Sequence, residues 1–457
     1  MRLFLATLMC KLLYLIGRLV GKGSSLPGRV ALAVCPNALS RVRLPKTIIA
    51  VTGSNGKTST TELLAHSLKA NGLNVGWNHE GANQIEGVAT MILRNSSFGG
   101  AVKCDALLFE SDERYAHQTF KAVPPTVLVV TNLFRDQLTR NGHPEFIQDC
   151  IRKAIDAAIE NGSDAGGPLL VLNADDPYVT ALAPADGSQK SIYFGISADA
   201  NRSAPNTGTA AGMYDDGAFC PVCKTRMRYD YRITAHLGGY KCDSCGRHRP
   251  DADIELSRLD AETGEAEFKS GKKTRLSFPS LTNAYNLAAA MAASAAVGVG
   301  AEASGRALDG FELSGGRTKG FSVGGRAGML LVSKHENSVS YNQSLEWVAN
   351  HNEKCTVVIL VDSISRKYYT SETSWLWDID FDILAACNVR DIVLAGRYAN
   401  ELAARFAMTV VDAGKISSIE SLGDLRGHVE SATEGGIFAL TCFSDKDKLL
   451  KALAGGK

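Results

Sequence analysis

Residues 47–60 read TIIAVTGSNGKTST. The run Thr47–Val51 is apolar and β-branched, and from Thr61 to Ala70 the apolar positions recur at helical spacing. A glycine-rich turn ending in Gly-Lys-Thr lies between them. The order strand, phosphate loop, helix is typical of a nucleotide site in an α/β protein. The loop is shorter than the general pattern, since Val51 stands where the first glycine would be.

The residue types in this loop suit phosphate chemistry. Gly53 and Gly56 let the backbone approach a phosphate closely, and the start of the following helix offers unpaired N–H groups. Lys57 can reach the β and γ oxygens, and the Thr58 hydroxyl can bind Mg²⁺. An ordinary glycine-rich turn is the alternative, which the flanking strand and helix disfavour.

A magnesium ligand is expected after the next strand of the sheet. The strand-like run Ala106–Phe109 is followed by Glu110-Ser-Asp-Glu113, and parallel sheets present ligands at the carboxyl ends of their strands. Glu110 is therefore our metal candidate. A single carboxylate after a strand is more often a solvated turn residue, so this assignment depends on the phosphate loop beside it.

Strands and helices alternate along most of the chain on both sides of this loop, which predicts an α/β fold with a parallel sheet. After a lead-in at 1–45, we expect an ATP-binding central domain at 46–315 with an insertion at about 215–250, and a Rossmann-like α/β domain at 316–457. The predicted strands are Ala106–Phe109, Thr126–Val130, Leu169–Leu172, Met329–Val332, Thr356–Val361 and Asp391–Leu394, and the clearest helices are Glu145–Glu160 and Asn283–Val297.

The first twenty residues are apolar but contain Lys11 and Arg18, so no uninterrupted run is long enough to span a bilayer. An amphipathic helix is expected instead. Packing of its apolar face on the protein's own core is favoured over contact with a membrane surface. A cleaved signal peptide is disfavoured, because no clear small-residue cleavage site follows.

Composition excludes several classes of protein. The 457 residues are 45% hydrophobic and 21% charged, which is ordinary for a packed globular chain and excludes disordered and fibrous proteins. Lys plus Arg number 49 against 48 Asp plus Glu, so no global field attracts a nucleic acid. Eleven cysteines are too few for a disulfide scaffold of this length and indicate a reducing cytoplasm.

Four cysteines form two CxxC pairs, eighteen residues apart, in the expected insertion. They are Cys220, Cys223, Cys242 and Cys245. This spacing predicts a tetrahedral zinc site, and four thiolates leave no open position for catalysis, so the site is structural. The remaining seven are expected to be buried thiols: Cys10, Cys35, Cys104, Cys150, Cys355, Cys387 and Cys442.

Five motifs occur in the order found in the Mur ligase family, and the chain resembles that family over most of its length. They are TGSNGKTST, EGAN at 80–83, ESDE at 110–113, TNLFRDQL at 131–138 and LNADDP at 172–177. Within the family the chain is similar to the MurT branch, because it has the NLFRDQL string, the four-cysteine insertion and TSWLWDIDF at 373–381.

The resemblance implies the ATP-using subunit of a lipid II isoglutaminyl synthase. ATP, with Mg²⁺, would phosphorylate the α-carboxyl of D-glutamate in the lipid II stem peptide, and ammonia would displace the phosphate to give D-isoglutamine. The ammonia would come from a GatD-like glutaminase subunit in a heterodimer. This implies peptidoglycan synthesis in the cytoplasm, at the inner face of the cell membrane where lipid II lies, and no nucleic-acid partner.

The resemblance also assigns residues by motif. Arg317, in GGR at the domain junction, would stabilise γ-phosphate charge as a domain-crossing cation, with a surface arginine as the alternative. Glu110 and Thr58 would reach Mg²⁺. The positions that match nucleotide or substrate contacts are Gly53, Asn55, Gly56, Lys57, Thr58, Asn83, Asn132, Asp136, Asn173, Asp176 and, on the adenine side, Asn286.

In MurT-like proteins an aspartate of the C-terminal domain completes the Cys-His pair of the bound glutaminase, and position in SWLWDIDF favours Asp378. Asp380 and Glu372 are the alternatives, as is a purely structural Asp378. The chain departs from the family here, because residues 362–372 are longer and lack the usual glycine, and SKHEN at 333–337 replaces a KNP segment. These departures leave the triad partner and the ammonia route open.

Two other functions remain as alternatives. An amino-acid-adding ligase of the Mur or folylpolyglutamate type shares the phosphate loop, but the cysteine insertion and the SWLWD segment argue against it. A zinc-ribbon nucleic-acid binder with a regulatory ATPase is disfavoured by the near-zero net charge and by mixed charges around the cysteines.

Overall fold

The computed structural model describes residues 1–19, 24–79, 82–136, 141–162, 166–184, 186–200, 215–260, 262–314, 318–351, 353–363, 373–386 and 388–454. The chain forms two compact units. The first contains Met1–Phe134, Pro144–Ala210 and Asp216–Leu313, and the second contains Ser314–Lys457 together with Arg135–His143. Each unit is described by itself.

The first unit is built on a mostly parallel sheet whose central strands are buried on both faces. Its strand order is β11-β10-β9-β6-β5-β4-β1-β3-β2. The strands are β1 (Thr47–Thr52), β2 (Val75–Trp77), β3 (Ala106–Glu110), β4 (Val127–Val130), β5 (Leu169–Asn173), β6 (Ser191–Ile196), β9 (Ile254–Leu259), β10 (Glu265–Phe268) and β11 (Lys273–Arg275). Among these described strands, β9 with β10 and β10 with β11 pair antiparallel, and the other pairs are parallel. This confirms the predicted α/β class.

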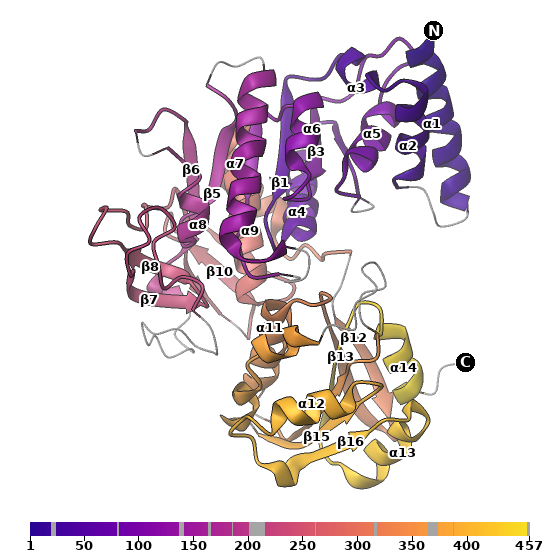
Figure 1. Ribbon diagram of the computed structural model, residues 1–457, viewed down its shortest axis with the longest axis vertical. Coiled ribbons are helices and arrows are strands. Elements are labelled where there is room, and N and C mark those ends of the chain that lie inside the picture. The colour runs from indigo at the N-terminus through magenta and orange to yellow at the C-terminus, as the bar shows by residue number, and fades with distance from the viewer. Residues whose placement is uncertain are drawn as a thin grey trace. The chain divides into compact units, whose positions relative to one another are not determined.

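Helices cover both faces of this sheet (Figure 1). On one face α6 (Ala116–Ala122) packs on α7 (Pro144–Asn161), over alternate strand residues such as Ile48 and Ala50. The other face carries α4 (Lys57–Ala70), α9 (Leu281–Ala296) and α10 (Ala301–Leu308), which contact one another. Helix α4 begins directly after the phosphate loop, so the loop lies at the carboxyl end of β1.

The lead-in consists of α1 (Arg2–Leu19), α2 (Leu26–Val34) and α3 (Ala38–Arg41), of which α1 and α2 pack with α5 (Ile85–Arg94). The approach is close, because a Cβ on Gly28 would lie 1.9 Å from the carbonyl oxygen of Glu86. Helix α1 is formed as expected, and one face of it packs on the core through small residues such as Ala6 and Cys10, with Leu3 against them. Part of its large apolar surface is exposed instead, including Leu12 and Leu15, so the expected packing holds for one face only.

The second unit is a six-stranded sheet in its described part, in the order β12-β13-β17-β14-β15-β16. The elements are β12 (Thr318–Val323), β13 (Arg326–Ser333), α11 (Ser338–Ala349), β14 (Cys355–Leu360), β15 (Val389–Ala395), α12 (Ala399–Phe406), β16 (Ile416–Ile419), α13 (Leu422–Ala432), β17 (Gly436–Cys442) and α14 (Lys446–Ala454). All pairs except β12 with β13 are parallel.

Apolar cores lie on both faces of this second sheet. One contains Tyr341 of α11 and Phe406 of α12, and the other contains Val429 of α13 and Leu453 of α14. The unit is thus a three-layer α/β sandwich, as predicted for the C-terminal part. No helix among the described residues is both long and apolar enough to cross a membrane.

Candidate active site

The phosphate loop has the backbone that its glycines predict. Gly53 and Gly56 have φ angles of +126° and +84°, which L side chains rarely adopt. Both also lie against neighbouring chain: a Cβ on Gly53 would be 2.2 Å from Thr131 Oγ1, and one on Gly56 would be 2.1 Å from Asn286 Oδ1. The loop therefore requires glycine at both positions for two separate reasons.

The loop is fastened to the segment that follows β4. The Ser54 N–H donates to the Asn132 carbonyl (2.8 Å), and the Asn55 N–H donates to Asn132 Oδ1 (2.9 Å). In return Thr131 Oγ1 donates to the Asn55 carbonyl (2.7 Å). Asn132, which the motif predicts, therefore shapes the loop through its own side chain. Thr131 also holds the loop, although its motif alone does not indicate this contact.

Lys57 is held at the mouth of the loop by an acidic partner. Its Nζ lies 2.5 Å from Glu113 Oε1 and also donates to the Gly53 carbonyl. The Lys57 side chain is 11% exposed and the Glu113 side chain 4% exposed. This pair pre-positions the ammonium group where phosphate oxygens are expected. The ESDE motif contained Glu113, but its role depends on a contact that no local pattern reveals.

Thr58 and Glu110 meet as predicted. Thr58 Oγ1 donates to Glu110 Oε2 at 3.1 Å, because Glu110 ends β3 directly beside Val51 of β1. Glu110 is 3% exposed, and its N–H donates to Asn78 Oδ1 (3.2 Å). A hydroxyl and a carboxylate oxygen this close are the hard oxygen donors that Mg²⁺ prefers, so the residues fit the predicted ion.

The remaining predicted residues of the first unit lie around this centre in different ways. Asn83 lies beside the ESDE segment, where its carbonyl accepts the Asp112 N–H (2.9 Å). Asn286, at the start of α9, accepts from Thr60 Oγ1 (3.3 Å) and lies against Gly56. Both are therefore within the loop's neighbourhood, as the motif match implied.

Asn173 and Asp176 are fully buried and bonded to backbone. Asn173 Nδ2 donates to the Thr131 carbonyl (2.9 Å). Asp176 caps helix α8 (Pro177–Thr180) by accepting from the Tyr178 N–H (2.9 Å), and it also accepts from the Leu133 N–H (2.7 Å). These contacts hold the segment that fastens the phosphate loop, so they support a positioning role rather than direct contact with a nucleotide.

Asp136 belongs to the second unit and is bonded there. It is 2% exposed, accepts from Asn337 Nδ2 (2.8 Å) and pairs with the Lys334 ammonium. Asn337 in turn caps α11 through the Ser340 N–H (2.7 Å). Lys334 and Asn337 lie in the SKHEN segment, which departs from the family pattern and for which the sequence predicts no contact with Asp136.

Asp378 pairs with Arg135, whose Nη1 lies 3.7 Å from Asp378 Oδ1 within the second unit. It closes the short 3₁₀ turn Ser374–Asp378. Burial, together with the charge of Asp382, raises the pKa of Asp380 above its usual range. The other two predictions, Glu372 and Arg317, lie outside the described residues.

A Cys-His contact occurs at the carboxyl end of β17, where Cys442 Sγ lies 3.7 Å from His335 Nε2. Burial raises the pKa of Cys442 to about 11 and lowers that of His335. Both groups are therefore neutral near pH 7, and Cys442 is not an activated nucleophile. This pair is therefore not arranged as a glutaminase centre.

The four predicted zinc ligands converge. Their sulfur atoms all lie within 4.8 Å of one another, with Cys220 to Cys245 at 3.6 Å and Cys223 to Cys242 at 3.4 Å. Tetrahedral Zn–S bonds of about 2.3 Å place sulfurs about 3.8 Å apart, so the cluster fits zinc. Of the other cysteines, Cys104 and Cys150 are only partly buried, contrary to expectation, and Cys387 lies outside the described residues.

The two cysteine knuckles have the same backbone bonds. Lys224 N–H donates to the Cys220 carbonyl (2.9 Å), as Gly246 N–H does to the Cys242 carbonyl (3.0 Å). A hairpin of β7 (Arg228–Thr234) and β8 (Leu237–Lys241) joins them. Buried Asp175 attaches this ribbon to the first unit, because its carbonyl accepts the Gly238 N–H (2.9 Å) and its carboxylate binds Arg249 (2.6 Å).

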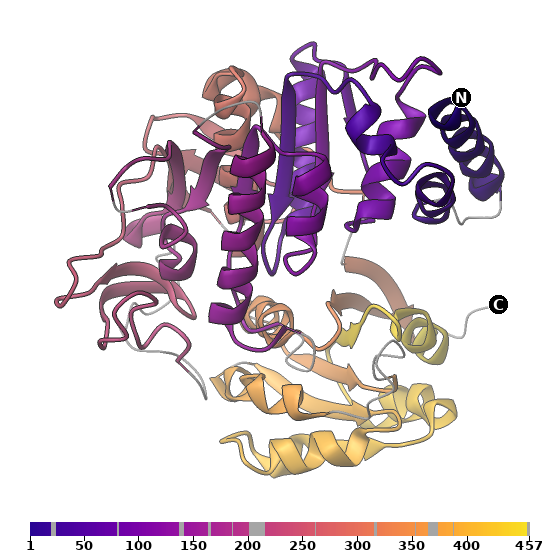
Figure 2. The same ribbon diagram turned by 45° about the horizontal axis from the view of Figure 1, so that its top comes forward.

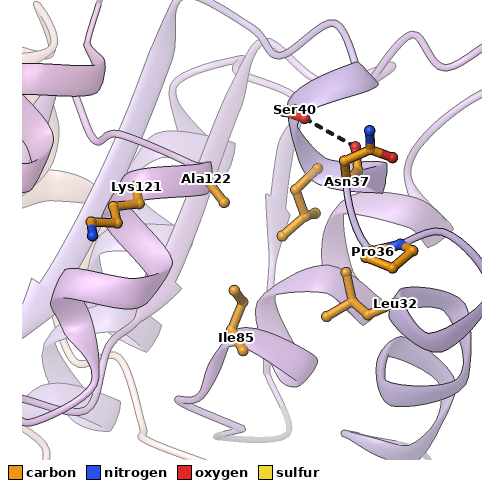
Figure 3. Close-up of a pocket in the computed structure, with 8 residues that line it drawn as sticks. Leu32, Pro36, Asn37, Ser40, Ile85, Lys121 and Ala122 are labelled. Atoms are coloured by element: carbon orange, nitrogen blue, oxygen red, sulfur yellow. Dashed lines mark hydrogen bonds between the residues drawn. The ribbon is translucent and has the colours of Figure 1, made fainter.

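A separate pocket of about 350 Å³ lies between the lead-in helices and α6 (Figure 3). Leu32, Pro36, Ile85 and Ala122 make its lining mainly apolar, and Lys121 supplies one cation. None of the predicted site residues lines it.

Comparisons with known proteins agree with this geometry. Residues 51–294 match the model of the Mur ligase middle domain, and residues 335–443 match the MurT ligase C-terminal domain. The chain is 30% identical to the MurT subunit of lipid II isoglutaminyl synthase (glutamine-hydrolyzing) from Staphylococcus aureus strain N315, over 90% of this chain and 89% of that one. The Streptococcus pneumoniae R6 subunit is 29% identical over 92% and 89%.

Solved structures of low sequence identity share the fold. A pseudomurein peptide ligase type C from Methanothermus fervidus gives a TM-score of 0.69 at 18% identity, covering 91% of this chain and 80% of that one. MurF from Thermotoga maritima, determined in complex with ADP, gives 0.57 at 15% identity, covering 94% and 82%.

Proposed function

This chain belongs to the Mur ligase family, and from that premise we propose that it is the ATP-using subunit of a lipid II isoglutaminyl synthase in peptidoglycan synthesis. The observation that carries the proposal is the phosphate loop at the carboxyl end of β1, with Lys57 at its mouth and the Thr58 hydroxyl against Glu110. These groups together suit the transfer of a γ-phosphate from ATP.

In the proposed reaction an oxygen of the substrate's α-carboxylate attacks the γ-phosphorus of ATP. The bond from that phosphorus to the bridging oxygen breaks, so ADP leaves and an acyl phosphate forms. Ammonia then attacks the carbonyl carbon, the C–O bond to phosphate breaks, and the nitrogen loses a proton. The products are D-isoglutamine, which is the α-amide of D-glutamate, together with ADP and inorganic phosphate.

The residues of the loop have distinct parts in this reaction. Backbone N–H groups at the N-terminus of α4 bind the phosphates, and Lys57 exchanges its contact with Glu113 for the β and γ oxygens. Thr58 and Glu110 would hold Mg²⁺, which neutralises charge on the phosphates when bound. Arg317 and Asn286 are proposed contacts for the γ-phosphate and the adenine side.

The ammonia is proposed to come from a GatD-like glutaminase subunit bound to the C-terminal domain. The contact of Cys442 with His335 would not release it here, since burial keeps Cys442 a neutral thiol near pH 7. Asp378 is our candidate for completing the partner's Cys-His pair, with Asp380 and Glu372 as alternatives. In this chain Asp378 pairs with Arg135, and a carboxylate at this position would orient an imidazole.

We further propose that the four-cysteine ribbon binds one structural zinc ion, and that the protein works in the cytoplasm at the membrane face that carries lipid II. The four sulfurs would fill the tetrahedral coordination of one zinc ion and leave no position for water, so the ion would contribute stability and no catalysis.

The proposal is tested by assembling the reaction. The purified chain with a GatD-like subunit, ATP, Mg²⁺, glutamine and lipid II should yield amidated lipid II, detected by mass spectrometry. Lys57→Ala should lower this rate by about 10³-fold or more while folding and zinc content stay unchanged. Lys190→Ala, a surface lysine of the same unit, is the control.

Two outcomes would contradict the proposal. Ligation of a free amino acid by the chain without any partner would instead support an amino-acid-adding Mur ligase. Full amidation by Lys57→Ala would remove the phosphate loop from the reaction.

A further inference from the structure

We propose that helix α1 is an in-plane anchor that binds the chain to the surface of an anionic lipid membrane. The proposal stands on α1 and its surroundings alone and does not require the amidation reaction. It goes beyond a membrane location in general, because it names the surface, the lipid charge and the residues that enter the lipid.

The apolar side chains of α1 are distributed in an unusual way. The face toward α2 and α5 buries small residues, among them Ala6, Cys10 and Gly17. Leu3, Leu8 and Leu13 are partly buried, but six other large apolar residues point outward. Their exposed fractions are 107% for Met1, 49% for Phe4, 46% for Leu5, 51% for Leu12, 61% for Leu15 and 54% for Ile16. A helix that only packed on its own protein would have the opposite arrangement.

These exposed residues form one continuous stripe, which we call the α1 stripe. At about 100° per residue they fall within an arc of about 120° on the helix. Arg18 and Lys11 project just beyond one border of the arc, and Arg2 just beyond the other. Apolar centre and cationic borders are the pattern of a helix that lies in a membrane interface with its basic side chains at the headgroups.

Neighbouring residues extend the same surface. Phe98 is 46% exposed, its ring centroid lies 5.2 Å from that of Phe4, and the Lys11 ammonium lies 5.2 Å from its centre. Leu26, at the start of α2, is 57% exposed. In both views α1 lies at an outer edge of the first unit, with α2 next to it (Figure 2).

The charge of the lead-in decides which partner fits. Residues 1–61 contain nine Lys and Arg and no Asp or Glu, so the rest of the chain carries 40 basic against 48 acidic residues. The described Arg2, Arg18, Arg29, Arg41 and Arg43 are exposed. Two copies of so cationic a face would repel each other, whereas an anionic lipid surface attracts it. This favours the membrane over a second copy of the chain.

The test uses the purified full chain and vesicles, without nucleotide or substrate, so its result is independent of the proposed reaction. We expect cosedimentation with vesicles of phosphatidylcholine and phosphatidylglycerol, weaker binding to phosphatidylcholine alone, and a decrease at high salt. The triple variant Leu12→Ser, Leu15→Ser, Ile16→Ser should lower the partition coefficient about 100-fold, because three aliphatic side chains no longer leave water.

A charge variant and a matched control complete the test. Arg2→Gln with Arg18→Gln should weaken binding to the mixed vesicles about 30-fold. Met408→Ser with Val410→Ser removes two apolar residues of the second unit that are 69% and 78% exposed, and binding should not change. Circular dichroism checks that each variant folds.

The proposal is overturned if the chain does not bind the mixed vesicles, or if the triple variant binds them as the unaltered chain does. It is also overturned if the unaltered chain self-associates in sedimentation equilibrium and the triple variant is monomeric without any difference in vesicle binding. That result would assign the α1 stripe to a second copy.

Discussion

Gly56 and Gly72 share a left-handed backbone but differ in what surrounds them. Their φ angles are +84° and +89°. A Cβ on Gly56 would lie 2.1 Å from Asn286 Oδ1, whereas a Cβ on Gly72 would meet nothing within 4 Å. The comparison separates the cost of backbone strain from the cost of displacing a neighbour at the nucleotide site.

We predict that Gly72→Ala lowers the free energy of unfolding by about 1–2 kcal/mol, the usual cost of a left-handed alanine, and that Gly56→Ala lowers it by more, because its Cβ must also displace Asn286. Only Gly56→Ala should also displace Asn286 from the loop and weaken ATP binding, by about tenfold or more. Chemical denaturation and isothermal titration with ATP measure the two effects. Equal ATP affinities for the two variants would show that Asn286 is not part of the nucleotide site.

For single residues, the sequence predicts a role where that role depends only on the residue's own motif. Lys57, Thr58 and Glu110 lie where the strand ends predicted, because parallel strands bring their carboxyl ends to one edge. Glu113 was not assigned, since its bond to Lys57 joins residues 56 positions apart. The same limit applies to Thr131, whose hydroxyl binds a carbonyl 76 positions away.

Helices and strands can be predicted from the sequence where the pattern of apolar residues fits only one arrangement of buried faces. Strands such as β4 and β14 are buried throughout, because both faces of their sheets are covered. Helix α1 shows where such patterns fail, because its apolar residues surround most of the helix and periodicity does not say which face the protein covers. Small residues such as Ala6, Cys10 and Gly17 determine that face, since they allow α2 and α5 to approach.

The ribbon is the element that depends most on a metal. Its own apolar core is small, consisting of residues such as Met227 and Tyr240 around the cysteines. We therefore predict about one zinc per chain, and that Cys220→Ser or a strong chelator removes it and unfolds the ribbon. Metal analysis measures the zinc content, and limited proteolysis in the part of the chain that follows β6 measures the unfolding of the ribbon.

Cys150→Ser is the control, because Cys150 lies on α7, outside the ribbon. Zinc content close to zero in the unaltered chain would contradict the prediction. Loss of zinc without any change in proteolysis would mean that the ribbon is held by contacts such as Asp175 with Arg249 alone.

At the scale of the whole molecule, the proposed reaction couples this chain to a second subunit. Asp378→Asn should lower glutamine-dependent amidation by the complex about 10³-fold or more, because a neutral amide does not stabilise the imidazolium and can hold the imidazole in the wrong tautomer. Amidation with ammonium chloride should remain, since the phosphate loop is untouched. Rates with the two nitrogen sources measure this.

Asp380→Asn and Arg135→Gln are the comparison variants. Arg135→Gln removes the ion pair that Asp378 makes in this chain but leaves its carboxylate in place. Equal loss of both activities in Asp378→Asn would show that Asp378 is structural. A larger effect of Asp380→Asn on glutamine use would move the proposed role to that residue.

If an acyl phosphate forms at the phosphate loop, one oxygen atom passes from the α-carboxyl group of the substrate to inorganic phosphate, and this transfer can be measured. Lipid II labelled with ¹⁸O in the α-carboxyl group of D-glutamate is amidated with ATP and ammonium chloride, and the released phosphate is examined by mass spectrometry. We predict one ¹⁸O in inorganic phosphate for each amide formed, together with ADP. Amide formation with unlabelled phosphate, or with AMP and pyrophosphate as products, would contradict the account.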